Sequence, residues 1–242
     1  MGTETGVPDG PTERTRSFWD ALNEPERETL LEAGRERDFH PNDEPLCFEG
    51  DASSTNVLII LSGWAKVTSP TPSGRQVVFA VRGPGDLVGE VSALFSRPRT
   101  ATVEALDAIR ALTVPASRFT TLLDDHPRWW WPLTATIAGR VDELSNRLRW
   151  HAEADGKRRL AHLLVYLAEL SLRYQKPGSA GIEILPRLSH TELGSWVDAS
   201  RETAARGFHE LRGQGLVATG WKRITVLDLQ GMRDYADGVA TP

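Results

Sequence analysis

The residues best suited to bind a small anion lie in residues 85–103, GDLVGEVSALFSRPRTATV. Gly89 allows a tight backbone turn, and the short helical turn expected after it would present free amide groups to an anion. Ten residues later, Arg99 offers a two-pronged guanidinium for a phosphate, and Thr100 offers a hydroxyl. Glu90 would repel a phosphate, but it can accept a hydrogen bond from a sugar hydroxyl. A phosphate and a ribose together make a nucleotide.

A second informative segment, residues 188–217, has the pattern of two short amphipathic helices around a tight turn. Ser189 can cap the first helix together with Glu192, three residues on. Ser200 can cap the second helix, which then begins at Arg201. Apolar side chains recur at helical spacing and predict one buried face, made of Leu193, Trp196, Val197, Phe208 and Leu211.

The second of these helices begins with side chains that can contact DNA bases. Arg201, Glu202 and Arg206 fall on its outer face, where Arg fits O6 and N7 of guanine and Glu can accept from N4 of cytosine. The alternative is a solvated face with an ion pair between residues one helical turn apart. The pattern predicts a DNA-reading helix with Ser200 and Thr203 beside the three charged residues.

The residues after this helix favour the DNA-binding interpretation. Two β-prone runs, 216–219 and 223–229, are joined by Gly220, Trp221 and Lys222 and predict a hairpin. A helix pair followed by a hairpin is a winged helix-turn-helix, in which Lys222 and Arg223 lie where a wing can touch phosphate.

The N-terminal half must position the anion-binding segment. From about residue 38 to 115, short β-prone runs alternate with Gly, Pro, Ser and Asp, which predicts an antiparallel roll or barrel. The runs are NVLIILSG, WAKVTS, QVVFAV, TATVEA and IRALTV. Residues 17–33 predict a short amphipathic helical segment, interrupted or restarted at Pro25, and residues 1–16 are expected to form a disordered tail.

Residues 128–154 predict a long helix with an apolar seam. The spacing of 4, 3, 4 and 3 is that of a coiled coil, and it favours a symmetric dimer; packing on the chain's own domain is the alternative. The seam comprises Ile137, Val141, Leu144, Leu148 and His151, with Trp130 and Thr134 continuing it backwards. Trp129, Trp130 and Trp131 cannot all face one way, so at least one is expected to pack on the roll or the partner.

Composition is that of an ordinary globular protein, with 40% hydrophobic and 25% charged residues in 242. The net charge is −7 over residues 1–154, with 16 basic and 23 acidic groups, and +2 over 155–242, with 12 and 10. No apolar stretch approaches a membrane span and the N-terminus lacks the apolar core of a signal peptide, so we expect a cytoplasmic protein. Cys47 is the single cysteine, which rules out an intramolecular disulfide.

These motifs together resemble the cyclic-AMP receptor protein (Crp/Fnr) family of bacterial transcription regulators. The resemblance covers residues 17–230 and rests on G-E-V with P-R-T-A-T, on E-G-D at 49–51, on L-I-I-L-S-G at 58–63 and on S-R-E-T at 200–203. It implies an α+β fold: a cyclic-nucleotide-binding roll over 17–127, a dimerisation helix over 128–154 and a winged helix-turn-helix over 155–242.

The resemblance also assigns roles to individual residues. Glu90 would take the ribose 2′-hydroxyl, and Arg99 and Thr100 would hold the cyclic phosphate. Two hydroxyls that contact adenine in relatives fall on Leu144 and Ser145, and only Ser145 keeps a hydroxyl. Cyclic AMP is therefore the expected ligand, and cyclic GMP is the alternative. The complete expected nucleotide site is Gly89, Glu90, Val91, Arg99, Thr100, Leu144 and Ser145.

The implied partners are double-stranded DNA, a second copy of the chain and RNA polymerase. The DNA would be a pseudo-palindrome with TGTGA-like half-sites, contacted by two recognition helices. The sequence does not decide whether a polymerase-contacting surface exists around residues 173–184. A change in the hinge at 153–157 would carry the nucleotide signal.

Two alternatives remain open at this point. A regulator of the same fold could bind DNA constitutively or sense another ligand, with Arg99 in a purely structural ion pair. A β-roll enzyme of the cupin type is the other, although the six histidines form no H-x-H or H-x-x-x-H pair, so we expect no metal site and no enzyme activity.

Overall fold

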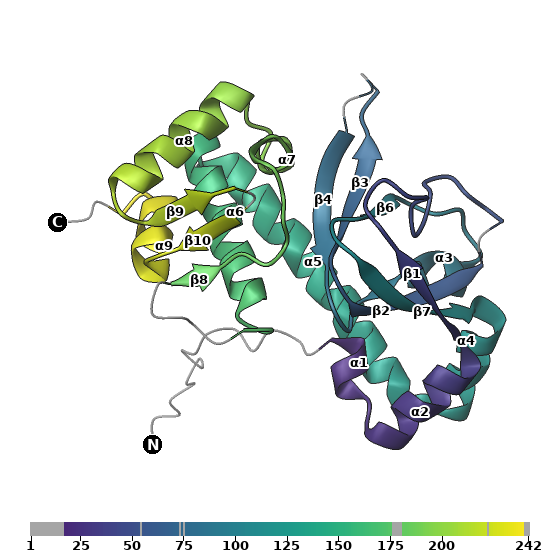
Figure 1. Ribbon diagram of the computed structural model, residues 1–242. Helices are drawn as coiled ribbons and strands as arrows, with labels where there is room; N and C mark the ends of the chain where they lie inside the picture. The colour runs from purple at the N-terminus through teal and green to yellow at the C-terminus, as the bar shows by residue number, and fades with distance from the viewer. Residues whose placement is uncertain are drawn as a thin grey trace, which may run out of the picture.

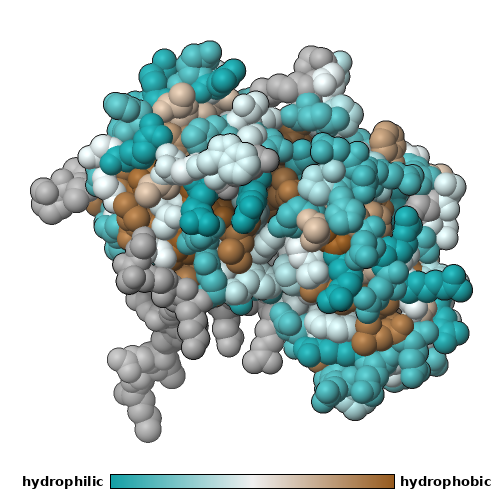
Figure 2. All heavy atoms as spheres, in the orientation of Figure 1, coloured by the Kyte–Doolittle hydropathy of each residue, from teal (hydrophilic) through white to brown (hydrophobic). Residues whose placement is uncertain are grey.

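The computed structural model describes residues 17–53, 55–72, 74, 76–175, 181–221 and 223–239, so the expected tail at 1–16 lies outside the described residues. Two lobes lie side by side, and the long helix α5 (Trp130–Glu153) extends from the N-terminal lobe to the C-terminal lobe (Figure 1). Hydrophilic residues cover most of the face in view, and hydrophobic residues appear there as separate patches (Figure 2).

The N-terminal lobe is built on two antiparallel sheets, as the alternating short runs predict. One sheet has the strand order β1-β7-β2-β5 and the other β4-β3-β6. The strands are β1 (Arg35–Phe39), β2 (Asn56–Ser62), β3 (Ala65–Pro70), β4 (Gln76–Arg82), β5 (Leu87–Val88), β6 (Thr102–Ala105) and β7 (Ile109–Pro115). All five predicted runs are strands; β1 was missed because four of its five residues are exposed.

Short helices close one end of this roll. They are α1 (Phe18–Ala21), α2 (Glu24–Ala33), α3 (Glu90–Phe95), α4 (Ala116–Asp125) and a 3-10 turn at Pro127–Trp129. The predicted restart at Pro25 is confirmed, because Asn23 caps α2 in a capping box with Glu26. Trp129 is fully buried among these helices, and its Nε1 donates to Glu26 Oε1 at 3.0 Å. Trp131, by contrast, is 80% exposed.

The C-terminal lobe is a winged helix-turn-helix with two additional helices. Its elements are α6 (Gly156–Ser171), β8 (Ile182–Glu183), α7 (His190–Trp196), α8 (Arg201–Gly213), β9 (Val217–Gly220), β10 (Arg223–Val226) and α9 (Leu229–Asp237). The predicted capping box of Ser189 and Glu192 is present. The predicted second β-run to residue 229 is wrong at its end, because Asp228 accepts from the Gly231 amide at 2.9 Å and starts α9.

One of the hydrophobic clusters spans both lobes, while two others lie within the N-terminal lobe. Trp64 and Val78 of the roll belong to the same buried cluster as Trp196 and the apolar face of α6. Polar contacts follow the same boundary, since Ser195 Oγ donates to Gln76 O at 2.8 Å where α7 lies beside β4 (Figure 1). We therefore expect movement of the DNA-binding lobe to disturb packing in the roll.

Candidate functional site

The predicted anion-binding turn forms at the end of β5. Gly89 has φ +81° and precedes α3, so the expected short helix after the glycine is confirmed. A Cβ atom on Gly89 would lie 2.0 Å from Arg99 Nη1. Only glycine accommodates both this left-handed conformation and the close guanidinium.

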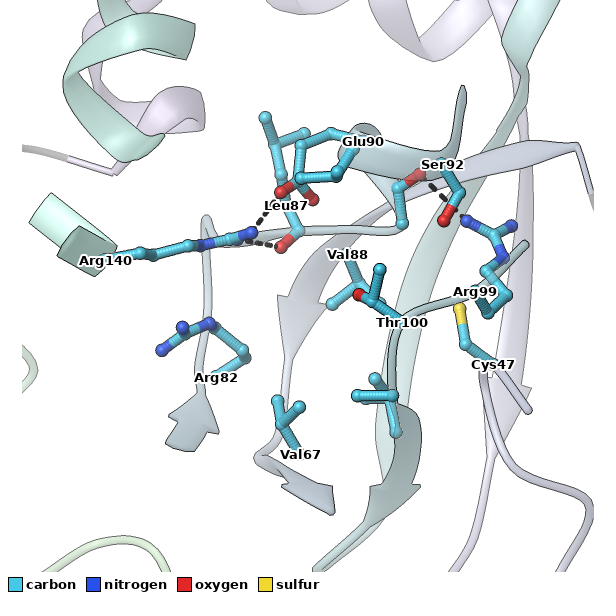
Figure 3. Close-up of a pocket in the computed structure, with 14 residues that line it drawn as sticks. Cys47, Val67, Arg82, Leu87, Val88, Glu90, Ser92, Arg99, Thr100 and Arg140 are labelled. Carbon is cyan, nitrogen blue, oxygen red and sulfur yellow. Dashed lines mark hydrogen bonds and ion pairs between the residues drawn. The ribbon is translucent and has the colours of Figure 1, made fainter. Parts of the chain in front are cut away.

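A cavity of about 100 Å³ lies beside this turn and is lined by Gly89, Glu90, Val91, Arg99 and Thr100 (Figure 3). These are five of the seven residues expected to hold a nucleotide. Leu144 and Ser145 are not among the lining residues; both are exposed on α5, Leu144 to 56%. Within one chain, the structure therefore brings together Gly89, Glu90, Val91, Arg99 and Thr100, here called the cassette, without these two α5 residues.

Arg99 is buried, and neutral backbone groups orient it. Arg99 is only 3% exposed. Its Nη1 donates to Gly89 O at 2.8 Å, and its Nη2 donates to Asn56 O at 2.6 Å. Thr100, next in the chain, is exposed and lines the cavity. The arrangement places a fixed positive charge and a hydroxyl on the same wall.

Glu90 occupies the wall between this pair and the long helix. It is 1% exposed, and its Oε1 is ion-paired with Arg140 of α5. Its Oε2 is buried and has no hydrogen-bond partner among the described residues. A buried carboxylate oxygen without a donor is costly, and a ligand hydroxyl in the cavity would satisfy it.

Arg140 is a cavity residue that sequence reasoning did not assign. Its Nη2 donates to Leu87 O at 2.6 Å, and burial, followed by the charge of Arg82, lowers its pKa. Arg140 lies one helical turn before Leu144, where the resemblance placed a ligand contact, so helical spacing was the available signal.

Arg82 of β4 also lines the cavity and connects it to the C-terminal lobe. Arg82 Nη1 lies 3.2 Å from Glu143 Oε2, and the Tyr166 hydroxyl of α6 donates to the other oxygen of Glu143. Burial alone would lower the pKa of Arg82, but the charges of Glu143, Tyr166, Asp86 and Glu90 together outweigh it and the pKa is raised. Burial and Glu143 together raise the pKa of Tyr166 well above its usual value. The ring of Tyr166 packs against Trp196 of α7, with centroids 6.1 Å apart.

The predicted DNA-reading residues lie on one open helix surface. Arg201, Glu202 and Arg206 of α8 are exposed, while the predicted apolar face of the helix pair is buried. Ser200 caps the helix by accepting from the Thr203 amide at 3.1 Å. Hydrogen bonds from its own amide and from the Ser200 hydroxyl lower the pKa of Glu202. Arg206 Nη2 donates to Thr203 Oγ1 at 3.3 Å.

The wing contributes one described basic residue. Arg223 opens β10, is exposed, and forms an ion pair with Glu183 of β8 at 3.2 Å. Lys222, also expected to contact DNA, lies outside the described residues.

Across the described ranges, no group of three or more His, Cys, Asp or Glu side chains could hold a metal ion. No helix in those ranges has both the length and the apolar character needed to cross a bilayer.

Comparison with known proteins agrees with both halves of this geometry. A cyclic nucleotide-binding domain family matches residues 37–126, and a Crp-like helix-turn-helix domain family matches residues 158–235. The chain belongs to the Crp/Fnr family of transcription regulators. Membership confirms the predicted α+β fold and the regulator class, and it excludes the β-roll enzyme, since the family consists of regulators.

Individual Crp/Fnr relatives are similar over most of their length. A cyclic AMP receptor protein of Thermus thermophilus is 26% identical over 216 residues, covering 89% of this chain and 95% of the relative. A CRP-like cAMP-activated global transcriptional regulator of Mycobacterium tuberculosis is 26% identical over 172 residues, covering 71% of this chain and 75% of the relative. The c-di-GMP responsive regulator CLP of Xanthomonas campestris has a similar fold, with TM-score 0.71, 20% identity and coverage of 85% and 100%.

Proposed function

We propose that this protein is a homodimeric, sequence-specific DNA-binding regulator controlled by a cyclic nucleotide held at Glu90, Arg99 and Thr100. The observation that carries the proposal is the buried Oε2 of Glu90, which lacks a donor among the described residues and lies in a cavity with Arg99 and Thr100. A ribose hydroxyl would donate to Glu90, while the phosphate would lie against Arg99 and Thr100. Relatives named for cyclic AMP support this ligand class.

A regulator that does not use a nucleotide is the second candidate. Arg99 already donates to two backbone carbonyls, as a structural arginine would. The cavity of about 100 Å³ is also smaller than the range of about 300–1,000 Å³ that is usual for small-molecule sites. Nucleotide binding therefore requires the cavity to widen, and cyclic AMP and cyclic GMP are the ligands to test.

The exposed seam of α5 supports the dimer. Val141, Leu144 and Leu148 are 58%, 56% and 63% exposed, although they are apolar and recur at heptad spacing. Pairing two copies along this seam would bury them and would bring Leu144 and Ser145 towards the ligand sites. Dimerisation would also place two α8 helices on one duplex, as a pseudo-palindromic site with TGTGA-like half-sites requires.

Base contacts are proposed for Arg201, Glu202 and Arg206, with phosphate contacts from Lys222 and Arg223. Their helix surface is open, and Ser200 and Thr203 fix the start of the helix on which they lie. RNA polymerase is a further proposed partner; of the segment considered for this contact, 173–184, residues 176–180 lie outside the described residues.

Calorimetric titration of the purified protein with cyclic AMP and cyclic GMP tests the ligand, followed by DNA binding with and without the tighter one. Arg99→Ala should abolish the response, whereas the exposed neighbour Arg97→Ala should retain it. An undiminished response in Arg99→Ala would exclude the cassette as the ligand site. Absence of any binding by wild type would favour the nucleotide-independent regulator.

The dimer is tested by sedimentation of Leu148→Glu, which should yield monomers of 26.7 kDa. Arg149→Glu changes a neighbouring exposed residue off the seam and should leave dimers intact. A wild-type monomer, or a Leu148→Glu dimer, would contradict pairing through α5.

A further inference from the structure

The cavity has a second cationic wall. Arg82 of β4 and Arg140 enter on the side of α5, across the cavity from Arg99 and Thr100 (Figure 3). Their side chains are only 12% and 25% exposed. If the proposed function holds, a phosphate at Arg99 and a sugar hydroxyl at Glu90 leave the base of the nucleotide facing this second wall.

Carboxylates offset the positive charge of the second wall. Arg82 is paired with Glu143, and Arg140 with Glu90, so each guanidinium of the second wall has a carboxylate neighbour. Because carboxylates offset both arginines, the second wall is suited to a neutral polar group.

Arg82 has hydrogen-bonding capacity left for such a group. Its Nη1 donates to Val81 O at 2.8 Å and contacts Glu143, whereas Nε and Nη2 make no hydrogen bond to any residue of the described ranges. Two parallel N–H groups fit two adjacent acceptors. Guanine presents O6 and N7 side by side, whereas adenine places an amino donor next to N7.

We propose that Arg82 contacts the base of the bound nucleotide and that the site prefers a cyclic nucleotide with a 6-oxopurine base, such as guanine, over one with adenine. This inference rests on the proposed function and shifts the expected ligand from cyclic AMP to cyclic GMP. Arg82 is a specificity-determining residue here, because the phosphate and sugar contacts are shared by both nucleotides.

The test is calorimetric titration of the full chain with cyclic GMP, cyclic IMP and cyclic AMP. Cyclic IMP retains O6 and N7 but lacks the 2-amino group, so it isolates the edge that Arg82 would contact. Wild type should bind cyclic GMP and cyclic IMP about 10- to 100-fold more tightly than cyclic AMP. Arg82→Lys keeps the charge beside Glu143 but loses the fork, and it should remove most of this preference while cyclic AMP affinity changes little.

Arg110→Lys provides the matched control, because Arg110 lies on β7 with a side chain 59% exposed and does not line the cavity. Equal or tighter binding of cyclic AMP by wild type would overturn the inference and leave the proposed function intact. A guanine preference that persists in both Arg82→Lys and Arg82→Met would exclude Arg82 as the base contact. Failure of all three nucleotides to bind wild type would overturn the proposed function itself.

Discussion

Tyr166→Phe removes a single hydroxyl from the contact between α5 and α6. That hydroxyl donates to Glu143, whose other oxygen lies 3.2 Å from Arg82. A buried hydrogen bond to a charged group contributes about 1.5–3 kcal/mol. Because the Glu143 side chain remains 31% exposed, water can replace part of the lost contact, so we expect a loss of about 1.5–2 kcal/mol in the free energy of unfolding.

Urea unfolding followed by circular dichroism measures this loss, and Tyr235→Phe is the matched control. The Tyr235 hydroxyl also donates to a carboxylate, Glu210 at 3.0 Å, but the Glu210 side chain is 37% exposed and also pairs with Lys157 at the surface. The control should lose no more than about 0.5–1 kcal/mol. Equal losses in the two variants, or a loss below about 0.5 kcal/mol for Tyr166→Phe, would refute the reasoning that Glu143 lies in a partly dry link between the lobes.

Three further perturbations test other parts of the structure. Burial raises the pKa of Glu192, but Lys66 and the hydrogen bonds from Ser189 together outweigh burial and hold the pKa below its ordinary value of 4.5. Lys66→Gln should therefore lower the free energy of unfolding by about 0.5–1 kcal/mol near neutral pH. In urea unfolding, this difference from wild type should vanish as pH falls through the pKa of Glu192. A difference that does not change with pH would contradict the ion pair. Gly89→Ala should lower the free energy of unfolding, measured by thermal unfolding, by about 2–4 kcal/mol. The backbone there has a left-handed φ of +81°, and the added methyl group would lie 2.0 Å from Arg99 Nη1. A loss under about 1 kcal/mol would show that the turn relaxes. Arg159 donates to the carbonyls of Val197, Asp198 and Ala154 at 2.9–3.1 Å. Arg159→Gln should therefore speed amide hydrogen exchange in the turn at 197–200. Unchanged exchange there would show that Arg159 does not hold this turn.

Local signals predicted much of the fold. The capping box at Ser189 and Glu192, the helix start after Ser200 and the left-handed glycine at 89 depend on residues within a few positions of each other. Five of the seven strands of the roll were predicted for the same reason, since each run is β-prone and bounded by turn residues. Such features are fixed by local backbone chemistry and can be recognised before any tertiary contact is known.

The features that could not be predicted depend on segments far apart in the chain. Arg140 was given no role from the sequence, because nothing near it indicates that Glu90, fifty residues earlier, is its partner. The link from Arg82 to Glu143 and Tyr166 likewise joins a strand and two helices. Strand β1 lacked an apolar pattern, and the start of α9 was hidden because Asp228 follows a β-prone run.

One turn of α5 joins the cavity to the DNA-binding lobe. Arg140 and Glu143 are three residues apart, on neighbouring positions of one helix face; the first holds Glu90 in the cavity, and the second holds Tyr166 of α6. Arg82 and Arg140 both line the cavity, so a nucleotide that displaced either side chain would change the environment of Glu143. A ligand shifts a conformational equilibrium only by its difference in affinity for the two states. A contact of about 1.5–2 kcal/mol corresponds to a change of about 10- to 30-fold in an equilibrium constant, which lies within the coupling usual for allosteric proteins. Under the proposed function, the Glu143 contact would therefore be strong enough to couple nucleotide binding to the placement of α8.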